Sequence, residues 1–275
     1  MSTLPYDAEL TPVGEGFGKK RFIGLEIETT RSEAGFPKPT AKSTNWDIHS
    51  WSLSSAAIRH IKKTLDPTNQ FIAMVGKDGD DIEVTTQPMS EDALRISSEG
   101  FLHNIQATCV PCDASGTHVH ISKLPKDKKN LQQNLYWFSA VFNKQFYAIF
   151  RRHTSWAESP RDYLIANKAR LGLPDKVNLK MLVEKGMPNG GFKHNIFVNH
   201  QNTYECRSGA ASTSPKEIRA WALLVKNIVD FCNQNSIVGH RFEEVLPKEP
   251  AYANLIKDRL TGEQLRQIVP IDLYL

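Results

Sequence analysis

Hydrophobic and polar residues alternate in four short segments of the chain, which is the pattern of β-strands that bury one face. In IGLEIETT, Glu26 and Glu28 share a face because side chains alternate across a strand, and the isoleucines and the leucine take the opposite face. Three other segments repeat this pattern: Glu83 in DIEVTTQP, His118 and His120 in GTHVHIS, and Glu205 and Arg207 in TYECRSG. If these strands pair, one face of the sheet collects four carboxylates and two imidazoles.

The rest of the pattern predicts long helices between the strands and a hairpin late in the chain. Strands are expected over residues 21–29, 71–76, 81–87 and 117–122, and the hairpin over 194–199 and 203–208. Helices are expected over 52–65, from Ser90 to about 107, over 128–150, from Ser159 toward Leu171, and from the cap Ser214-Pro215-Lys216-Glu217 onward. Polar residues over 30–50 predict a long loop that acts as a substrate lid, whereas 172–192 is irregular.

These elements predict an α+β protein with one antiparallel or mixed sheet. Helices would cover its apolar face, and the polar face would stay open to a ligand. Six apolar residues at helical spacing favour core packing: Leu131, Leu135, Phe138, Phe142, Phe146 and Ile149. No repeat or domain boundary is evident, so we expect a single domain over 1–275, with a core at about 21–232 and a helical extension over 233–275.

Composition narrows the class of protein. The 275 residues are 40% hydrophobic and 23% charged, and no apolar run approaches the roughly 20 residues of a membrane helix. The net charge of +4 is spread along the chain, and the densest basic cluster, Lys123–Lys129, is expected to be a solvated loop and the start of a helix. We therefore expect neither a membrane nor a nucleic acid as a partner. The first ten residues lack signal-peptide features, and four cysteines without a regular framework suit a reducing cytoplasm.

The gathered acids need a cation, because like charges held close together repel and raise one another's pKa. Carboxylate-rich sites with one or two imidazoles favour magnesium or manganese over structural zinc. Arg207 on the same face adds a planar donor that grips phosphoryl oxygens, as phosphoryl transfer requires. Taken singly, each motif has a simpler interpretation: exposed acids, a packed or surface histidine pair, and a cross-strand ion pair between Glu205 and Arg207.

The order of the motifs resembles the amidoligase family, which belongs with glutamine synthetase and the glutamate–cysteine ligases in the carboxylate–amine ligase superfamily. The family pattern runs approximately G-x-E-x-E, E-[IV]-x-[ST]-x-P, C-G-x-H-V-H and T-x-E-[FY]-R. In this chain it falls on Gly24/Glu26/Glu28, Glu83/Val84/Pro88, Gly116/His118/Val119/His120 and Thr203/Glu205/Cys206/Arg207. The likeness spans about residues 21–232.

The resemblance implies a fold and roles for the motif residues. The antiparallel sheet would curve into a half-funnel like that of glutamine synthetase, with helices outside and with nucleotide and metal ions inside. Glu28 and Glu83 would bind the metal nearest the acceptor carboxylate. The metal that bridges the ATP phosphates would be held by Glu26, Glu205 and one of two histidines, His118 or His120, of which His118 is preferred. Arg207 would lie against the γ-phosphate during transfer.

The implied function is ATP-dependent formation of an amide or peptide bond through an acyl phosphate, with Mg²⁺ or Mn²⁺ as cofactor. The partners would be small-molecule or peptide carboxylates and amines, and Arg207 and Glu83 are the catalytic candidates. Further phosphate or substrate candidates, each of which can also be an ordinary surface charge, are Lys193, Arg151, Arg152 and Arg161.

Two other functional classes fit parts of the sequence. A metal-dependent hydrolase could use the His-x-His and glutamate cluster, although the remaining histidines do not follow a repeated β/α pattern. A non-catalytic binding protein could retain a ligase scaffold, although the charged motif positions are intact. Cys109 and Cys112 with the two histidines also have the spacing of a zinc site, but the proline between the cysteines favours a turn.

Overall fold

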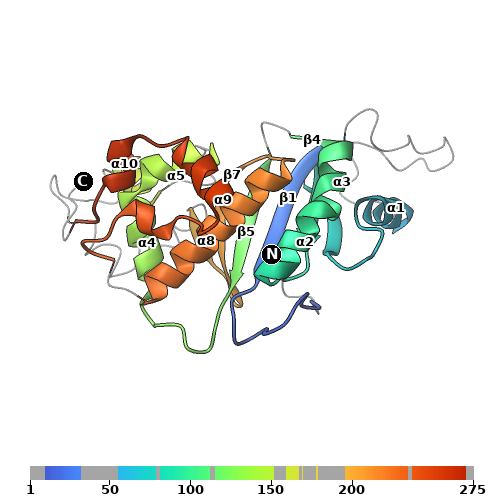
Figure 1. Cartoon of the computed structure of the whole chain (residues 1–275), viewed down its shortest axis with the longest axis horizontal. Helices are drawn as coiled ribbons and strands as arrows, with labels where there is room; N and C mark the ends of the chain where they lie inside the picture. Colours follow the sequence, from blue (N-terminus) through green and yellow to red (C-terminus); the bar gives the residue numbers. More distant parts are fainter. Residues whose placement is uncertain are drawn as a thin grey trace.

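The computed structural model describes residues 10–31, 55–78, 81–111, 115–151, 159–166, 169, 178, 196–234 and 237–270. Within these ranges the protein is an α+β structure with one antiparallel sheet. Helices pack on one face of the sheet, and the longest of them crosses the central strands (Figure 1). The α+β prediction is therefore confirmed.

The sheet places the four motif-bearing strands side by side. Its order is β2-β3-β1-β5-β7-β6, and β4 pairs with the end of β1. The bounds are β1 (Ile23–Arg31), β2 (Ile72–Asp78), β3 (Asp81–Thr86), β4 (Cys109–Val110), β5 (Gly116–Ser122), β6 (Phe197–Asn199) and β7 (Thr203–Ala210). Two hairpins, β2–β3 and β6–β7, flank the central strands β1 and β5. The motifs, which are far apart in the sequence, therefore lie on neighbouring strands.

The helices form a layer on the apolar side. Their bounds are α1 (Ser55–Leu65), α2 (Glu91–Glu99), α3 (Phe101–Thr108), α4 (Leu131–Val141), α5 (Asn143–Phe150), α6 (Pro160–Ala166), α8 (Pro215–Gln234), α9 (Pro250–Lys257) and α10 (Gly262–Arg266), with a 3₁₀ turn at Phe242–Val245. The predicted cap is present in α8, which begins at Pro215 with Glu217 in its first turn, and α8 packs against β1, β5 and β7. In the described ranges, no helix combines the length and apolar character needed to span a bilayer.

Two helices that the sequence predicts as continuous are each divided. The first breaks at Gly100, whose φ of −113° and ψ of −108° are not helical, and this separates α2 from α3. The second breaks at Phe142, with φ −101° and ψ 24°, between α4 and α5. The apolar stripe runs through this second break because all six of its residues are fully buried, as predicted. Hydrophobic spacing therefore locates the buried face but not the break.

Some predicted elements fall partly outside the described residues. Most of the expected loop at 30–50 and of the irregular stretch at 172–192 lies outside them. The strand expected at 194–199 is observed as β6, and the helix expected toward Leu171 is observed as α6.

The C-terminal helices are attached to the helical layer by polar contacts. Gln145 on α5 donates hydrogen bonds to the backbone of Gln264 and the side chain of Gln267. Arg259, which follows α9, binds the carboxylate of Glu217 at the start of α8. The expectation of a single domain over 1–275 stays a prediction.

Strands β5 and β7 approach one another closely at Gly209. This residue pairs with Thr117, and a side chain added at Gly209 would overlap the carbonyl oxygen of Thr117. We expect Gly209→Ala to destabilise the protein by about 1–3 kcal/mol, because the strands must separate to admit the methyl group. Urea unfolding measures the change. The matched control is Gly76→Ala, where the nearest atom to an added Cβ is 4.0 Å away, and equal effects of the two substitutions would contradict this account.

Asp66 caps the turn that leads from α1 into β2, and its carboxylate is buried. Its Oδ2 accepts hydrogen bonds from the amides of Phe71 (2.7 Å) and Ile72 (2.9 Å), and its Oδ1 accepts one from the Thr68 hydroxyl (2.7 Å). Burial would raise the pKa of Asp66, but these hydrogen bonds outweigh burial and hold the pKa below its ordinary value.

Asp66 should therefore stabilise the fold above the pKa of a free aspartate, and this stabilisation should disappear as the pH falls through the lowered pKa of the folded state. We expect Asp66→Asn to cost about 2 kcal/mol at pH 7 and progressively less below pH 4. Urea unfolding of wild type and variant across this pH range measures the difference. The exposed substitution Asp258→Asn is the control, and a cost for Asp66→Asn that does not change with pH would refute the assignment.

Candidate metal centre

The register of the sheet brings the predicted polar residues together on one face. Glu26 on β1 pairs with His118 on β5, and His120 pairs with Glu205 on β7. On the other side of β1, Glu28 pairs with Glu83 on β3. Five of these six side chains are buried, with between 1% and 9% of each residue exposed: Glu26, Glu28, His118, His120 and Glu205. Glu83 is half-buried.

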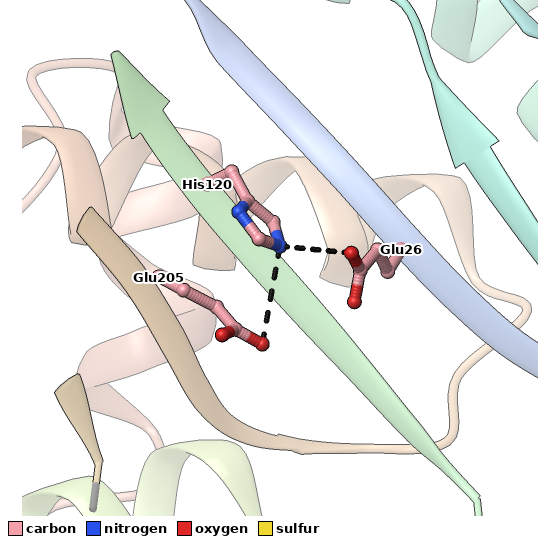
Figure 2. Close-up of side chains that lie close together, drawn as sticks. All are labelled: Glu26, His120 and Glu205. Carbon is pink, nitrogen blue, oxygen red and sulfur yellow. Dashed lines mark ion pairs between the residues drawn. The ribbon is translucent and has the colours of Figure 1, made fainter. Parts of the chain in front are cut away.

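Three of these side chains form the compact centre of the cluster (Figure 2). Glu26, His120 and Glu205 each offer one ligand atom, and these atoms all lie within 4.8 Å of one another. His120 Nε2 is 3.2 Å from Glu26 Oε1 and 3.9 Å from Glu205 Oε1. Figure 2 shows the three side chains pointing toward a common point from three adjacent strands. This geometry can hold a divalent cation.

His118 lies next to the compact group and binds its carboxylates directly. Its Nδ1 is 3.0 Å from Glu26 Oε2 and 3.2 Å from Glu205 Oε1. Its Nε2 faces Glu28 Oε1 at 3.8 Å, so His118 connects the two halves of the cluster. The sequence interpretation preferred His118 as the ligand that completes the Glu26 and Glu205 set. In the structure His120 forms the compact group with Glu26 and Glu205, while His118 contacts both carboxylates, so the preference for His118 stays a prediction.

The ionisable groups of the cluster shift one another's pKa values. Burial would raise the pKa of Glu26, but the attraction of His120 and the hydrogen bond with His118 outweigh burial and lower the pKa to about 2. Burial would likewise raise the pKa of Glu205, but hydrogen bonds with His118 and His200 hold it well below its usual range. Burial would lower the pKa of His118, but Glu205 and Glu26 raise it to about 9. The two carboxylates and the His118 imidazole therefore favour one another's charged forms.

The donor set fits a divalent cation. Glu26 Oε1 is buried and makes no hydrogen bond with any described residue, although it faces His120 Nε2. A buried carboxylate oxygen without a hydrogen bond is costly, and a bound cation would satisfy it. Carboxylates with one imidazole are the ligands that manganese and magnesium sites use. The centre therefore has the chemistry of a metal site.

Glu28 and Glu83 form a second acidic position beside this centre. They lie directly opposite each other across β1 and β3, where like charges repel. Glu28 Oε2 accepts a hydrogen bond from the Gly116 amide at 2.5 Å, and Glu83 Oε1 accepts one from the Thr85 hydroxyl at 3.1 Å. These neutral donors orient the carboxylates without neutralising them.

Arg207 lies at the edge of the cluster, where β7 contains a bulge. Val119 pairs with Cys206, whereas Thr117 pairs with Gly209, so Arg207 and the following serine face the single residue His118. Arg207 Nε is 3.2 Å from Glu205 Oε1, and 27% of its side chain is exposed. Arg207 therefore forms an ion pair with Glu205, and its side chain is partly exposed.

Of the other predicted basic residues, the structure describes Arg151 and Arg161. Lys193 and Arg152 lie outside the described residues. Arg151 is bound to Glu217 at 2.6 Å and stacks over the Trp221 ring, which gives it a structural contact. Arg161 is half-buried on α6.

Two residues of the cluster were not predicted as contacts. His200 Nε2 is 2.5 Å from Glu205 Oε2, and its ring stacks on His120 with 5.8 Å between centroids. Thr203 Oγ1 is 3.2 Å from His120 Nδ1, which orients the ring so that Nε2 faces the carboxylates. The alternation of side chains across the hairpin could have predicted the contact of His200 with Glu205. A turn at Gln201 and Asn202 sets His200 opposite Thr203, on the same face as Glu205.

The zinc interpretation of the cysteines is not supported at Cys109. Cys109 pairs with Arg31 on β1, five residues beyond Glu26, which is the partner of His118. At about 3.3 Å per residue, this separates Cys109 from the histidines by roughly 16 Å along the strand. Its side chain is buried in the hydrophobic core. Cys112 lies outside the described residues.

A groove of about 760 Å³ lies elsewhere, between the residues before β1, the start of α2, and α8. None of the six candidate ligands lines it. Two of its cations are held in ion pairs, since Arg21 binds Asp127 and Asp230, and Lys226 binds Asp230 and Glu91. The strand-borne cluster and this groove are therefore separate features.

Comparison with known proteins gives a distant structural likeness. No family model matches the chain, and no curated protein matches it. A solved structure, described as the crystal structure of a novel glutamine synthase homolog, aligns with 92% of this chain at 14% sequence identity and a TM-score of 0.40. The alignment covers 58% of that protein, so this chain spans a little over half of its length.

Binding of a divalent cation at the centre should stabilise the folded protein. At a Mn²⁺ concentration of about 100 times the dissociation constant, we expect the free energy of unfolding to rise by about 2.7 kcal/mol, because the ion binds the folded state. The Glu26→Gln/Glu205→Gln variant should lose this increase. Urea unfolding with and without Mn²⁺ measures the difference, after the metal-free stability of each protein is recorded.

The matched control for this experiment is Glu99→Gln/Glu249→Gln, which removes the same number of charges from exposed positions. This control should keep the full increase. An equal increase in the Glu26→Gln/Glu205→Gln variant would show that Mn²⁺ acts elsewhere.

Proposed function

We propose that this protein is an ATP-dependent carboxylate–amine ligase that forms an amide or peptide bond. The observation that carries the proposal is the convergence of Glu26, His120 and Glu205. Arg207 forms an ion pair with the Glu205 carboxylate of this group. These residues come from motifs that resemble those of the amidoligase family. As part of this proposal, the polar face of the sheet lines a half-funnel like that of glutamine synthetase.

The acidic cluster suits a reaction between anions. A substrate carboxylate and the phosphates of ATP repel each other, and this charge must be neutralised before they react. When bound, Mg²⁺ or Mn²⁺ supplies that neutralisation and polarises the phosphoryl group. Glu26, Glu205 and His120 would hold the ion on the phosphate side, and Glu28 with Glu83 would hold the ion near the acceptor carboxylate.

Arg207 would stabilise the phosphoryl group during transfer. Its Nε is 3.2 Å from Glu205 Oε1, which keeps the guanidinium beside the cluster, and 27% of its side chain is exposed. A planar guanidinium matches the geometry of phosphoryl oxygens. The bulge in β7 sets this side chain at the edge of the cluster, where a γ-phosphate could reach both Arg207 and the metal ligands.

The proposed reaction has two steps. An oxygen of the substrate carboxylate attacks the γ-phosphorus of ATP, the bond to the β-phosphate oxygen breaks, and ADP leaves. The amine nitrogen then attacks the acyl carbon, phosphate leaves with its oxygen, and the nitrogen loses a proton. Phosphorylation is needed because a carboxylate has only oxide as a leaving group. The protein contributes positioning and charge neutralisation.

The substrates in this proposal are small-molecule or peptide carboxylates and amines. Selectivity is assigned to the 30–50 segment, and Lys193 and Arg152 remain nucleotide-contact candidates; all three lie largely or wholly outside the described residues. The described cysteines, Cys109, Cys206 and Cys232, are free and buried, in keeping with the expectation of a reducing cytoplasm.

Hydroxylamine tests the proposal, because it converts an acyl phosphate into a stable hydroxamate. We expect the protein with Mg-ATP, hydroxylamine and pooled carboxylates to release phosphate and form hydroxamate in equal amounts. Arg207→Gln should lower this rate on the order of 10³-fold, as loss of a transition-state arginine does. The exposed substitution Arg266→Gln is the matched control and should not change the rate.

Three outcomes would contradict ligation. Bound ATP without hydroxamate or phosphate release, for any carboxylate, would exclude acyl-phosphate formation from the substrates supplied. Metal-dependent hydrolysis without nucleotide would favour the hydrolase alternative. Failure of calorimetry to detect Mg-ATP binding would favour a non-catalytic binding protein.

A further inference from the structure

The turn between β6 and β7 is tied to the end of β5. The amide of His200 donates to Thr203 O at 3.0 Å and closes the turn, and the amide of Lys123 donates to Asn202 O at 2.9 Å. The Lys123 ammonium also binds the carbonyl oxygens of His200 and Gln201. The backbone of this turn is therefore held in place beside the metal centre.

The side chain of His200 extends from this turn to Glu205. His200 Nε2 is 2.5 Å from Glu205 Oε2, while the other oxygen, Oε1, is 3.2 Å from His118 Nδ1 and 3.2 Å from Arg207 Nε. The ring of His200 stacks on His120 with an interplanar angle of 29°. The two oxygens of Glu205 thus have different roles, because one faces the turn and the other faces the cluster.

We propose that His200 is a positioning residue that occupies one oxygen of Glu205, so that this carboxylate presents its other oxygen to the divalent cation. The inference rests on the proposed function, because it assumes a cation at the centre. The terminal torsion of a glutamate is broad, so a carboxylate that is held at only one of its two oxygens can rotate. A hydrogen bond from His200 to Oε2 removes that freedom and sets the direction of Oε1.

Partners that orient a metal ligand typically contribute 10–100-fold to metal affinity, and loss of His200 should have an effect of about this size. His200→Phe keeps an aromatic ring against His120 but removes the donor. His200→Gln keeps an N–H donor on a shorter side chain. A packing role predicts that the phenylalanine variant binds metal better than the glutamine variant, whereas a positioning role predicts the reverse.

Calorimetric titration of the full-length, nucleotide-free protein with Mn²⁺ separates these roles, and electron paramagnetic resonance of the bound Mn²⁺ reports its coordination. We expect His200→Phe to weaken Mn²⁺ binding by about 10–100-fold and to change the spectrum. His200→Gln should recover most of the affinity. The matched control is His240→Phe, because His240 contacts Glu244 at 2.9 Å on the surface, and this variant should bind like wild type.

If His200→Phe does not fold, Lys123→Met provides a second route, because it releases the turn and leaves every candidate ligand in place. It should weaken Mn²⁺ binding in the same direction. Wild-type affinity in the folded His200→Phe variant, or in Lys123→Met if it is needed, would overturn the positioning role while leaving the metal centre intact. Absence of Mn²⁺ binding by wild type would instead overturn the centre, and the positioning role with it.

Discussion

The arrangement of the candidate site depends on one constraint, which is that each central strand buries both of its faces. Ile23, Leu25 and Ile27 are fully buried under the helices, and this fixes which face of β1 carries Glu26 and Glu28. A slip of one residue would move every apolar side chain to the polar face, so the hydrophobic core also fixes the register. The pairs Glu26–His118 and His120–Glu205 follow from that register. The core therefore positions the acids, although it contains none of them.

Alternation in the sequence was sufficient to predict which side chains share a face. Glu26, Glu28, His118, His120 and Glu205 all fall where the strand period places them. Alternation does not say which strands are neighbours, and that order is known only from the structure. It also cannot separate His118 from His120, because both lie on one face. The two histidines differ in the diagonal contacts that they make across β5, because Glu26 reaches His120 and Glu205 reaches His118.

Other features depend on single residues whose conformation is set by tertiary packing. The break at Gly100 and the bulge before Gly209 change the path of the backbone without changing the hydrophobic pattern. His200 illustrates a different limit. Alternation along the hairpin predicts which face His200 lies on. A histidine next to a turn nevertheless resembles an ordinary surface residue until the structure places Glu205 beside it.

Two buried glutamates in this protein show what distinguishes a structural carboxylate from a candidate ligand. Both oxygens of Glu217 are satisfied by fixed partners, since Oε1 binds Arg259 and Oε2 binds Arg151 at 2.6 Å and the hydroxyl of Ser212 at 2.5 Å. Such a carboxylate joins elements of the fold, and both of its oxygens are already occupied by these partners. Glu26 is as deeply buried, yet its Oε1 makes no hydrogen bond with the described residues and faces an imidazole beside a second carboxylate. A fold that needed Glu26 only for stability would gain from pairing that oxygen, so its state favours a role in binding.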